Sequence, residues 1–169
     1  MTKEREQDDS AGAAVVRKPV IAVIGAGKCS KKLRDMAALV GKYVAEHGGV
    51  VVCGGLGGIM EGVARGAKES GGVTIGILPS DNKEDANEFI DYVIPTGFGE
   101  ARNIMVVRAA DAVVALPGKY GTLSEMAFAL NAGKPLIAVN AWKLGDEVIQ
   151  INDPLEAARR AMELAVQKL

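Results

Sequence analysis

A glycine-rich turn carries the first chemical signal in the sequence. It reads Gly54-Gly55-Leu56-Gly57-Gly58, directly follows the apolar run 50–53 and precedes a helical pattern. Glycine has no Cβ and accepts positive φ angles, so backbone N–H groups at a helix start can close on a phosphate there. A tight strand-to-helix turn needs one or two glycines for packing alone, and this turn has four. We therefore predict that the glycines of this turn bind the phosphate of a ligand: Gly54, Gly55, Gly57 and Gly58.

A second turn of the same kind runs from Pro117 to Thr122. Thr122 is placed either to cap the following helix or to hydrogen-bond an anion at its start. Glu125 lies one turn further on, on the helix face that looks back toward the turn. Because Thr122 and Glu125 also have the T-x-x-E spacing of a capping box, a structural cap and a ligand contact are equally good interpretations of that spacing. The turn residues that we predict to bind the ligand are Gly118, Lys119, Tyr120, Gly121 and Thr122.

The segment Gly25-Ala26-Gly27-Lys28-Cys29-Ser30 resembles two nucleotide-binding signatures but completes neither. A dinucleotide fingerprint would have Gly or Ala in place of Ser30, and an acidic residue in place of Cys53 at the end of the next strand. A P-loop would need glycine where the chain has Ala22. These departures exclude an NAD dehydrogenase and a P-loop ATPase, and leave Gly25 and Gly27 as a third backbone wall of the site.

Arg102 follows a glycine pair in the segment 97–103 and precedes the strand that leads to Pro117. Its guanidinium could pair with a phosphate or with Glu125. An exposed arginine at the start of a helix is the alternative. The sequence offers no Ser-His-Asp or Cys-His set that would support hydrolysis through a covalent nucleophile.

The composition of the chain limits the classes of partner that we expect it to bind. Twenty basic and 21 acidic residues give a net charge of −1, so nucleic acid is not an expected partner. The one basic run, 28–34, is either a solvated helix face or a modest attraction for an anion. Two cysteines without a CxxC motif and a single histidine predict neither a disulfide framework nor a metal site. Without a long apolar stretch or a signal-peptide core, we expect a cytoplasmic protein that does not enter a membrane.

Strands and helices alternate along the chain. Continuous apolar runs predict strands buried on both faces at 20–24, 50–53, 73–78, 92–94, 112–116 and 135–139. Helical spacing predicts helices at about 33–47, 59–70, 100–110, 121–131 and 154–168, the last with Asp153 as N-cap and Pro154 at its first position.

This alternation predicts an α/β fold: a single Rossmann-like three-layer domain with a mostly parallel sheet. We assign residues 1–17, which are polar and charged, to a disordered leader and residues 18–169 to the nucleotide-binding domain. Ligands of such sheets bind outside the carboxyl ends of the strands, which is where the glycine-rich turns fall.

The two turns, together with Arg102, resemble one known family. It contains the LOG-type phosphoribohydrolases (cytokinin-activating enzymes), the molybdenum-cofactor carrier proteins and proteins long mislabelled lysine decarboxylases. Its GGGxxGxM signature is similar to the segment from Gly54 to Met60, and its PGGxGTxxE signature to the segment from Pro117 to Glu125. The resemblance covers about residues 19–169.

The resemblance implies a homodimer or higher homo-oligomer that binds a small phosphorylated ligand, with Met60 at the site. In the LOG-type enzymes an arginine and the glutamate of the second signature break the N-glycosidic bond of a nucleoside 5′-monophosphate. Arg102 and Glu125 match that catalytic pair. No cofactor is required for such a reaction; in the carrier branch, molybdopterin or the molybdenum cofactor would be the bound ligand.

Two differences from the signatures of the LOG-type enzymes indicate which branch of the family the chain resembles more. Lys119 replaces the second glycine of PGG, and Asn103 stands where the enzymes have lysine after the arginine. Gly-Glu-Ala-Arg-Asn and the Leu-Ser-Glu ending are more similar to the carrier branch, so whether the protein is an enzyme stays open. We favour a binding protein for a phosphorylated pterin or nucleotide-like ligand. A phosphoribohydrolase, though not a lysine decarboxylase, and a ligand-sensing interaction module are the alternatives.

Overall fold

A computed structural model describes residues 16–168 and contains one seven-stranded sheet. Every neighbouring pair of strands is parallel, and their order across the sheet is β4-β3-β2-β1-β5-β6-β7. The strands are β1 (Val20–Ile24), β2 (Val50–Cys53), β3 (Val73–Leu78), β4 (Tyr92–Pro95), β5 (Ala112–Ala115), β6 (Leu136–Ala138) and β7 (Ile149–Gln150). The predicted Rossmann-like fold is confirmed, and the sheet is wholly parallel.

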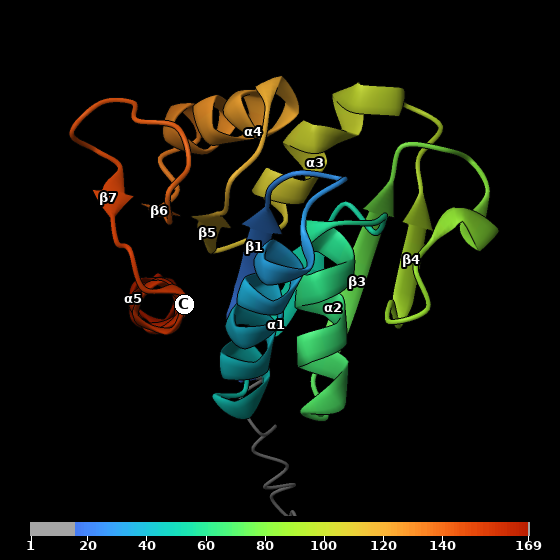
Figure 1. Cartoon of the computed structure of the whole chain (residues 1–169), viewed down its shortest axis with the longest axis horizontal. Helices are drawn as coiled ribbons and strands as arrows, with labels where there is room; N and C mark the ends of the chain where they lie inside the picture. Colours follow the sequence, from blue (N-terminus) through green and yellow to red (C-terminus); the bar gives the residue numbers. More distant parts are fainter. Residues whose placement is uncertain (1–15, 169) are drawn as a thin grey trace, which may run out of the picture.

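Helices cover both faces of the sheet (Figure 1). One face carries α1 (Lys31–Glu46), α2 (Ile59–Glu69) and α5 (Pro154–Val166), and the other carries α3 (Asn103–Arg108) and α4 (Tyr120–Asn131). Two short 3-10 turns, η1 (Lys83–Asp85) and η2 (Gly99–Arg102), lie in the connections on either side of β4. The chain therefore forms the three layers that the sequence predicts.

Strand β1 shows how the apolar runs build two cores. Ile21 and Val23 pack under α1, α2 and α5, whereas Ala22 and Ile24 face α3 and α4. Successive strand side chains point to opposite faces, so a strand covered on both sides must be apolar at every position. The continuous apolar runs that predicted the strands are therefore a consequence of burial on both faces of the sheet.

The order of the strands reverses at β1. The chain moves from β1 through β2 and β3 to β4 at one edge, then returns to place β5 on the other side of β1. The loops after β1 and β5 consequently leave in opposite directions and open a crevice at the carboxyl ends of the strands. This crevice is where the predicted turns meet.

The structure differs from the sequence-based expectations in three main places. The helix expected at 100–110 is a 3-10 turn, η2, followed by the shorter α3. Strand β7, with two residues, was not predicted because two residues cannot establish a period. Helix α4 begins at Tyr120 with Lys119 as its N-cap and no side-chain cap bond, so Thr122 does not cap it and the capping-box interpretation fails.

The predicted leader lies almost entirely outside the described residues, and its boundary at residue 17 stays a prediction. Across residues 16–168, no helix has both the length and the apolar character needed to span a bilayer.

Candidate functional site

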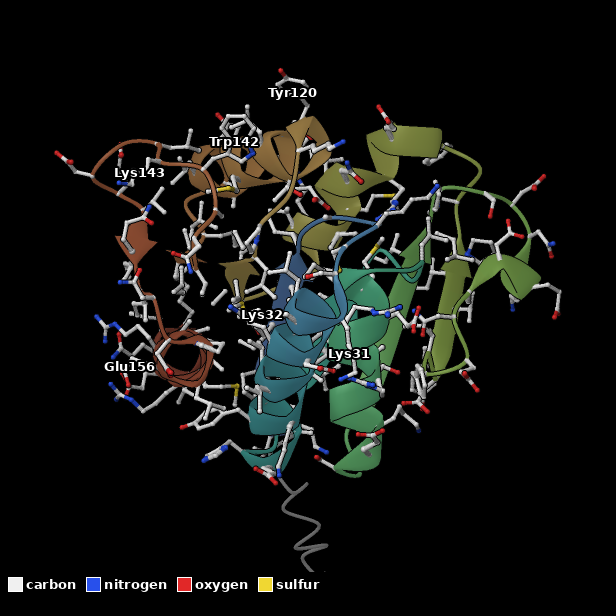
Figure 2. The ribbon with its side chains drawn as sticks, viewed as in Figure 1. Lys31, Lys32, Tyr120, Trp142, Lys143 and Glu156 are labelled. Atoms are coloured by element: carbon white, nitrogen blue, oxygen red, sulfur yellow. The ribbon has the colours of Figure 1, made fainter. Side chains whose placement is uncertain are left out.

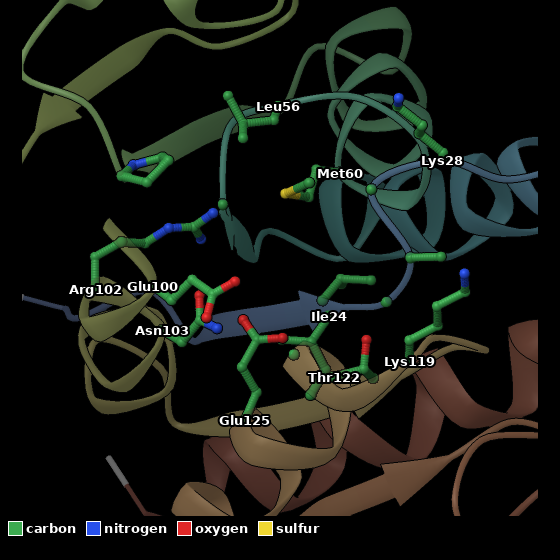
Figure 3. Close-up of a pocket in the computed structure, with 17 residues that line it drawn as sticks. Ile24, Lys28, Leu56, Met60, Glu100, Arg102, Asn103, Lys119, Thr122 and Glu125 are labelled. Atoms are coloured by element: carbon green, nitrogen blue, oxygen red, sulfur yellow. The ribbon is translucent and has the colours of Figure 1, made fainter. Parts of the chain in front are cut away.

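A cavity of about 430 Å³ lies at the carboxyl ends of β1, β2 and β5 (Figure 3). Its volume falls within the range of small-molecule sites. The residues that line it come from the end of β1, the three predicted turns, the residue after β3, η2 and the first two turns of α2, α3 and α4: Val23, Ile24, Gly25, Ala26, Gly27, Lys28, Gly54, Leu56, Met60, Pro79, Glu100, Arg102, Asn103, Lys119, Gly121, Thr122 and Glu125.

Arg102 is buried at one end of this cavity, with 7% of its surface exposed. Its guanidinium lies against the backbone of Gly54, where a Cβ would come within 2.6 Å of Nη2. Within the described part of the chain its Nε–H has no hydrogen-bond partner. Burial lowers the pKa of the guanidinium, and the nearby Glu125 opposes this effect. A buried cation without an ion pair favours a ligand whose acceptor atoms can contact the guanidinium.

Glu125 faces Arg102 across the cavity from α4 (Figure 3), and it too is 7% exposed. Burial raises the pKa of its carboxyl from 4.5 to about 7, and the positive charge of Arg102 opposes this rise. The two side chains influence each other through space, and no ion pair joins them among residues 16–168. An open gap between opposite charges leaves room for a ligand group that both can contact.

The N-terminus of α4 forms the opposite wall of the cavity. The first turn of a helix has N–H groups without intrahelical partners and a partial positive charge. Gly121 and Thr122 occupy this turn and line the cavity, and Thr122 is almost fully buried. Lys119, exposed at the mouth, adds a full positive charge. This combination of N–H groups, a hydroxyl and a cation is typical of a phosphate site.

The predicted glycines separate into two groups. Gly25, Gly27, Gly54 and Gly121 line the cavity, whereas Gly55, Gly57, Gly58 and Gly118 are not among the residues that line it.

Packing accounts for two of the glycines that do not line the cavity. Gly58 has φ 64° and an added Cβ would lie 2.6 Å from the carbonyl carbon of Gly27. An added Cβ at Gly118 would collide with the Oγ1 of Thr122. These glycines allow the loops to approach one another closely.

The backbone of Ala26 links all three turns. Its N–H donates to the carbonyl of Pro117 at 3.0 Å, and its carbonyl accepts from the N–H of Ile59 at 2.9 Å. Backbone hydrogen bonds thereby hold together the loop after β1, the loop after β5 and the start of α2.

Several lining residues were not among the predicted site residues. Lys28 belonged to the basic run, and Asn103 directly follows Arg102, so both had a weak signal in the sequence. Leu56 lies within the predicted turn 54–58 and Glu100 within the segment 97–103, although neither was itself predicted to bind. Pro79 had no signal, because only the fold brings the end of β3 to the cavity. Tyr120, which was predicted to bind the ligand, lies outside the cavity and is 78% exposed.

A sequence profile described as the SLOG cluster4 family matches residues 18–166. The chain belongs to this family. Among relatives of this SLOG cluster4 protein, one from Archaeoglobus fulgidus is 40% identical over 147 residues, which are 87% of this chain and 97% of the relative. The cytokinin riboside 5′-monophosphate phosphoribohydrolase of Mycobacterium tuberculosis is 34% identical over 121 residues, covering 66% of this chain and 64% of the enzyme.

The solved structures most like this SLOG cluster4 protein include two from molybdenum-cofactor proteins. The molybdenum cofactor binding protein of Rippkaea orientalis is 34% identical, with a TM-score of 0.81 over 89% of this chain and 98% of its own. The molybdenum cofactor carrier protein of Chlamydomonas reinhardtii is 32% identical, with a TM-score of 0.80 over 89% of this chain and 99% of its own. The predicted resemblance to the LOG-like and carrier proteins is confirmed.

Proposed function

We propose that the protein reversibly binds a small phosphorylated ligand with a flat ring, of the pterin or nucleotide type, as molybdenum-cofactor carriers do. The buried Arg102, which lines the cavity and forms no ion pair among residues 16–168, is the observation that carries this proposal. A buried cation without a partner is costly for the folded protein. Acceptor atoms of a bound ligand at its guanidinium would lower that cost.

The two ends of the cavity suit the two ends of such a ligand. The N–H groups at the start of α4, with Thr122 and Lys119, would hold the phosphate. Leu56 and Met60 offer apolar contact to a flat ring, while Glu125 and Arg102 offer an acceptor and donors to its polar edge. The residues present therefore fit a phosphorylated pterin. In this proposal the molybdenum cofactor is cargo, and the chain's residues bind and orient it.

Binding of GMP tests the proposal, because guanine carries the same amino and oxo groups on its ring edge as a pterin. Titration calorimetry of the wild type should detect GMP and a phosphorylated pterin. Arg102→Met should weaken both by at least about 30-fold, since it removes one partner of a buried charged contact. Arg108→Met, an exposed arginine on α3, is the matched control and should bind normally. Equal affinity of the Arg102 and Arg108 variants would refute the proposal.

A second function is supported by the raised pKa of Glu125, which is about 7. A carboxyl that titrates near neutral pH is suited to acid–base work. In a phosphoribohydrolase, water would replace the base at the anomeric carbon of a nucleoside 5′-monophosphate, giving the free base and ribose 5-phosphate. Glu125 would transfer a proton between the attacking water and the leaving base, and its ionised form would stabilise the positive charge that develops on the sugar. Arg102 would orient the nucleotide.

Incubation with AMP and N6-substituted AMP tests this second function. The expected result is release of free base by the wild type and loss of that release in Glu125→Gln. Binding of AMP without any base above the level of Glu125→Gln would exclude hydrolysis and leave the binding function in place. The matched part of the chain spans 64% of the mycobacterial enzyme's length. Our proposal of hydrolysis therefore rests on the residues of the cavity and not on the likeness to the whole enzyme.

A further inference from the structure

Tyr120 and Trp142 form an exposed aromatic pair (Figure 2), and Lys119, which directly precedes Tyr120, lines the cavity. Tyr120 is 78% exposed and Trp142 is 37% exposed. Their ring centroids are 6.0 Å apart and their planes differ by 26°, which is an offset stack. Because one face of Tyr120 is directed to Trp142, the remaining exposed surface of the ring is available to another flat group.

The pair is fixed to the start of α4. The Nε1–H of Trp142 donates to the carbonyl of Lys119 at 3.2 Å. The same carbonyl accepts the N–H of Leu123 at 3.0 Å, which is the first hydrogen bond of the helix. Asn140, at φ 51°, lies in the turn that follows β6 and leads to Trp142. A ring held in this way loses little conformational entropy when a ligand stacks on it.

Lys119 lies between the pair and the cavity. Lys119 lines the cavity, whereas the next residue along the chain, Tyr120, lies outside it. A phosphate at the start of α4 would therefore sit at the boundary between the two. Lys143 follows Trp142 in the sequence and is also exposed, so the outer surface carries cations beside the aromatic rings.

We propose that the site takes ligands with two flat heterocycles joined by a diphosphate. One ring occupies the cavity, the diphosphate lies at Lys119 and the start of α4, and the second ring stacks on the pair formed by Tyr120 and Trp142. This inference rests on the proposed binding function and names its ligand class. The positive charges of Lys119 and Lys143 beside the aromatic pair favour a phosphorylated small molecule, and not an apolar protein surface, as the group that stacks on it.

Three guanine nucleotides test the inference: GMP, GDP and diguanosine diphosphate (GppG). The second guanine of GppG should improve affinity over GDP by about tenfold, as stacking of a base on an aromatic side chain does. Trp142 is the only tryptophan of the chain, so its fluorescence should respond to GppG much more than to GDP. An affinity for GppG within twofold of that for GDP would overturn the inference while the binding function stands.

Variants of Tyr120 identify the stacking surface. Tyr120→Ala should reduce the advantage of GppG over GDP to below about twofold, whereas Tyr120→Phe, which keeps the ring, should preserve it. Phe128→Ala, which removes a partly exposed ring two turns along α4, is the matched control and should also preserve it. Circular dichroism should show that all three variants are folded.

Two other outcomes would count against the inference. If Tyr120→Ala changed the mass in light scattering while the advantage of GppG persisted, the pair would be a contact between protein chains. If none of the three nucleotides bound to the wild type, the binding function would fail for guanine ligands and this inference would fail with it.

Discussion

Replacing Glu125 by glutamine should change how the stability of the protein depends on pH. Glu125 is buried opposite Arg102, and its pKa is about 7 in the folded chain against 4.5 in the unfolded chain. Between these values the folded state holds a proton that the unfolded state has released. Stability therefore falls as the pH rises through this window, because the buried carboxyl must give up its proton.

The size of the effect follows from the two pKa values. A difference of one pKa unit corresponds to about 1.4 kcal/mol, so the full penalty above pH 7 is about 3 kcal/mol. Most of it, about 2.5 kcal/mol, develops between pH 5 and pH 8. Glutamine has nearly the same shape and no proton to lose, so the Glu125→Gln protein lacks this penalty.

Urea denaturation of both proteins at pH 5, 6, 7 and 8 measures the difference directly. Subtracting the free energies of unfolding cancels the titration of the other groups. The free energy of unfolding of Glu125→Gln minus that of the wild type should rise by about 2.5 kcal/mol from pH 5 to pH 8. A difference that is constant from pH 5 to pH 8 would show that Glu125 has an ordinary pKa, and would remove the main support for its acid–base role.

Two further predictions concern the glycines and the cation at the site. Gly58→Ala should cost about 3–5 kcal/mol in thermal or urea unfolding, because its positive φ is combined with a backbone collision. Gly71→Ala, which has a similar φ of 71° but open space around it, should cost only about 1 kcal/mol; equal costs would contradict the packing explanation. Lys119→Gln should weaken GMP binding about two- to fivefold at low salt and have no effect at 1 M salt, whereas Lys83→Gln, on η1 and outside the cavity, should have no effect at either. A salt-independent loss at Lys119 would indicate a shape effect instead of a charge effect.

The sheet was predictable because its strands are buried on both faces. The runs at β1 and β2 are apolar at consecutive positions, and such runs have few other interpretations in an alternating chain. Strand β7 has two residues, one of them exposed, and its pairing with β6 depends on the whole sheet. No local sequence pattern could have predicted this strand.

The site was predictable where its chemistry lies in one turn, and unpredictable where the fold assembles it. The meeting of Arg102 with Glu125 could be anticipated from the family resemblance, in which an arginine and the glutamate of the second signature act together. The interpretation of Glu125 as a capping residue failed because α4 begins two residues before Thr122, and T-x-x-E spacing is the same in either register. Pro79 reaches the cavity only because β3 lies two strands from β1.

The links made by Ala26 have a consequence for how fast a ligand can leave. Because its N–H and carbonyl join the loops after β1 and β5 to the start of α2, none of these segments can open without breaking a backbone hydrogen bond. If the chain binds a ligand as proposed, the phosphate end of the cavity is formed before the ligand arrives, and association should require no loop closure. Release would then be governed by the strength of the contacts themselves, and a protein that receives the ligand would accelerate it by competing for its exposed end.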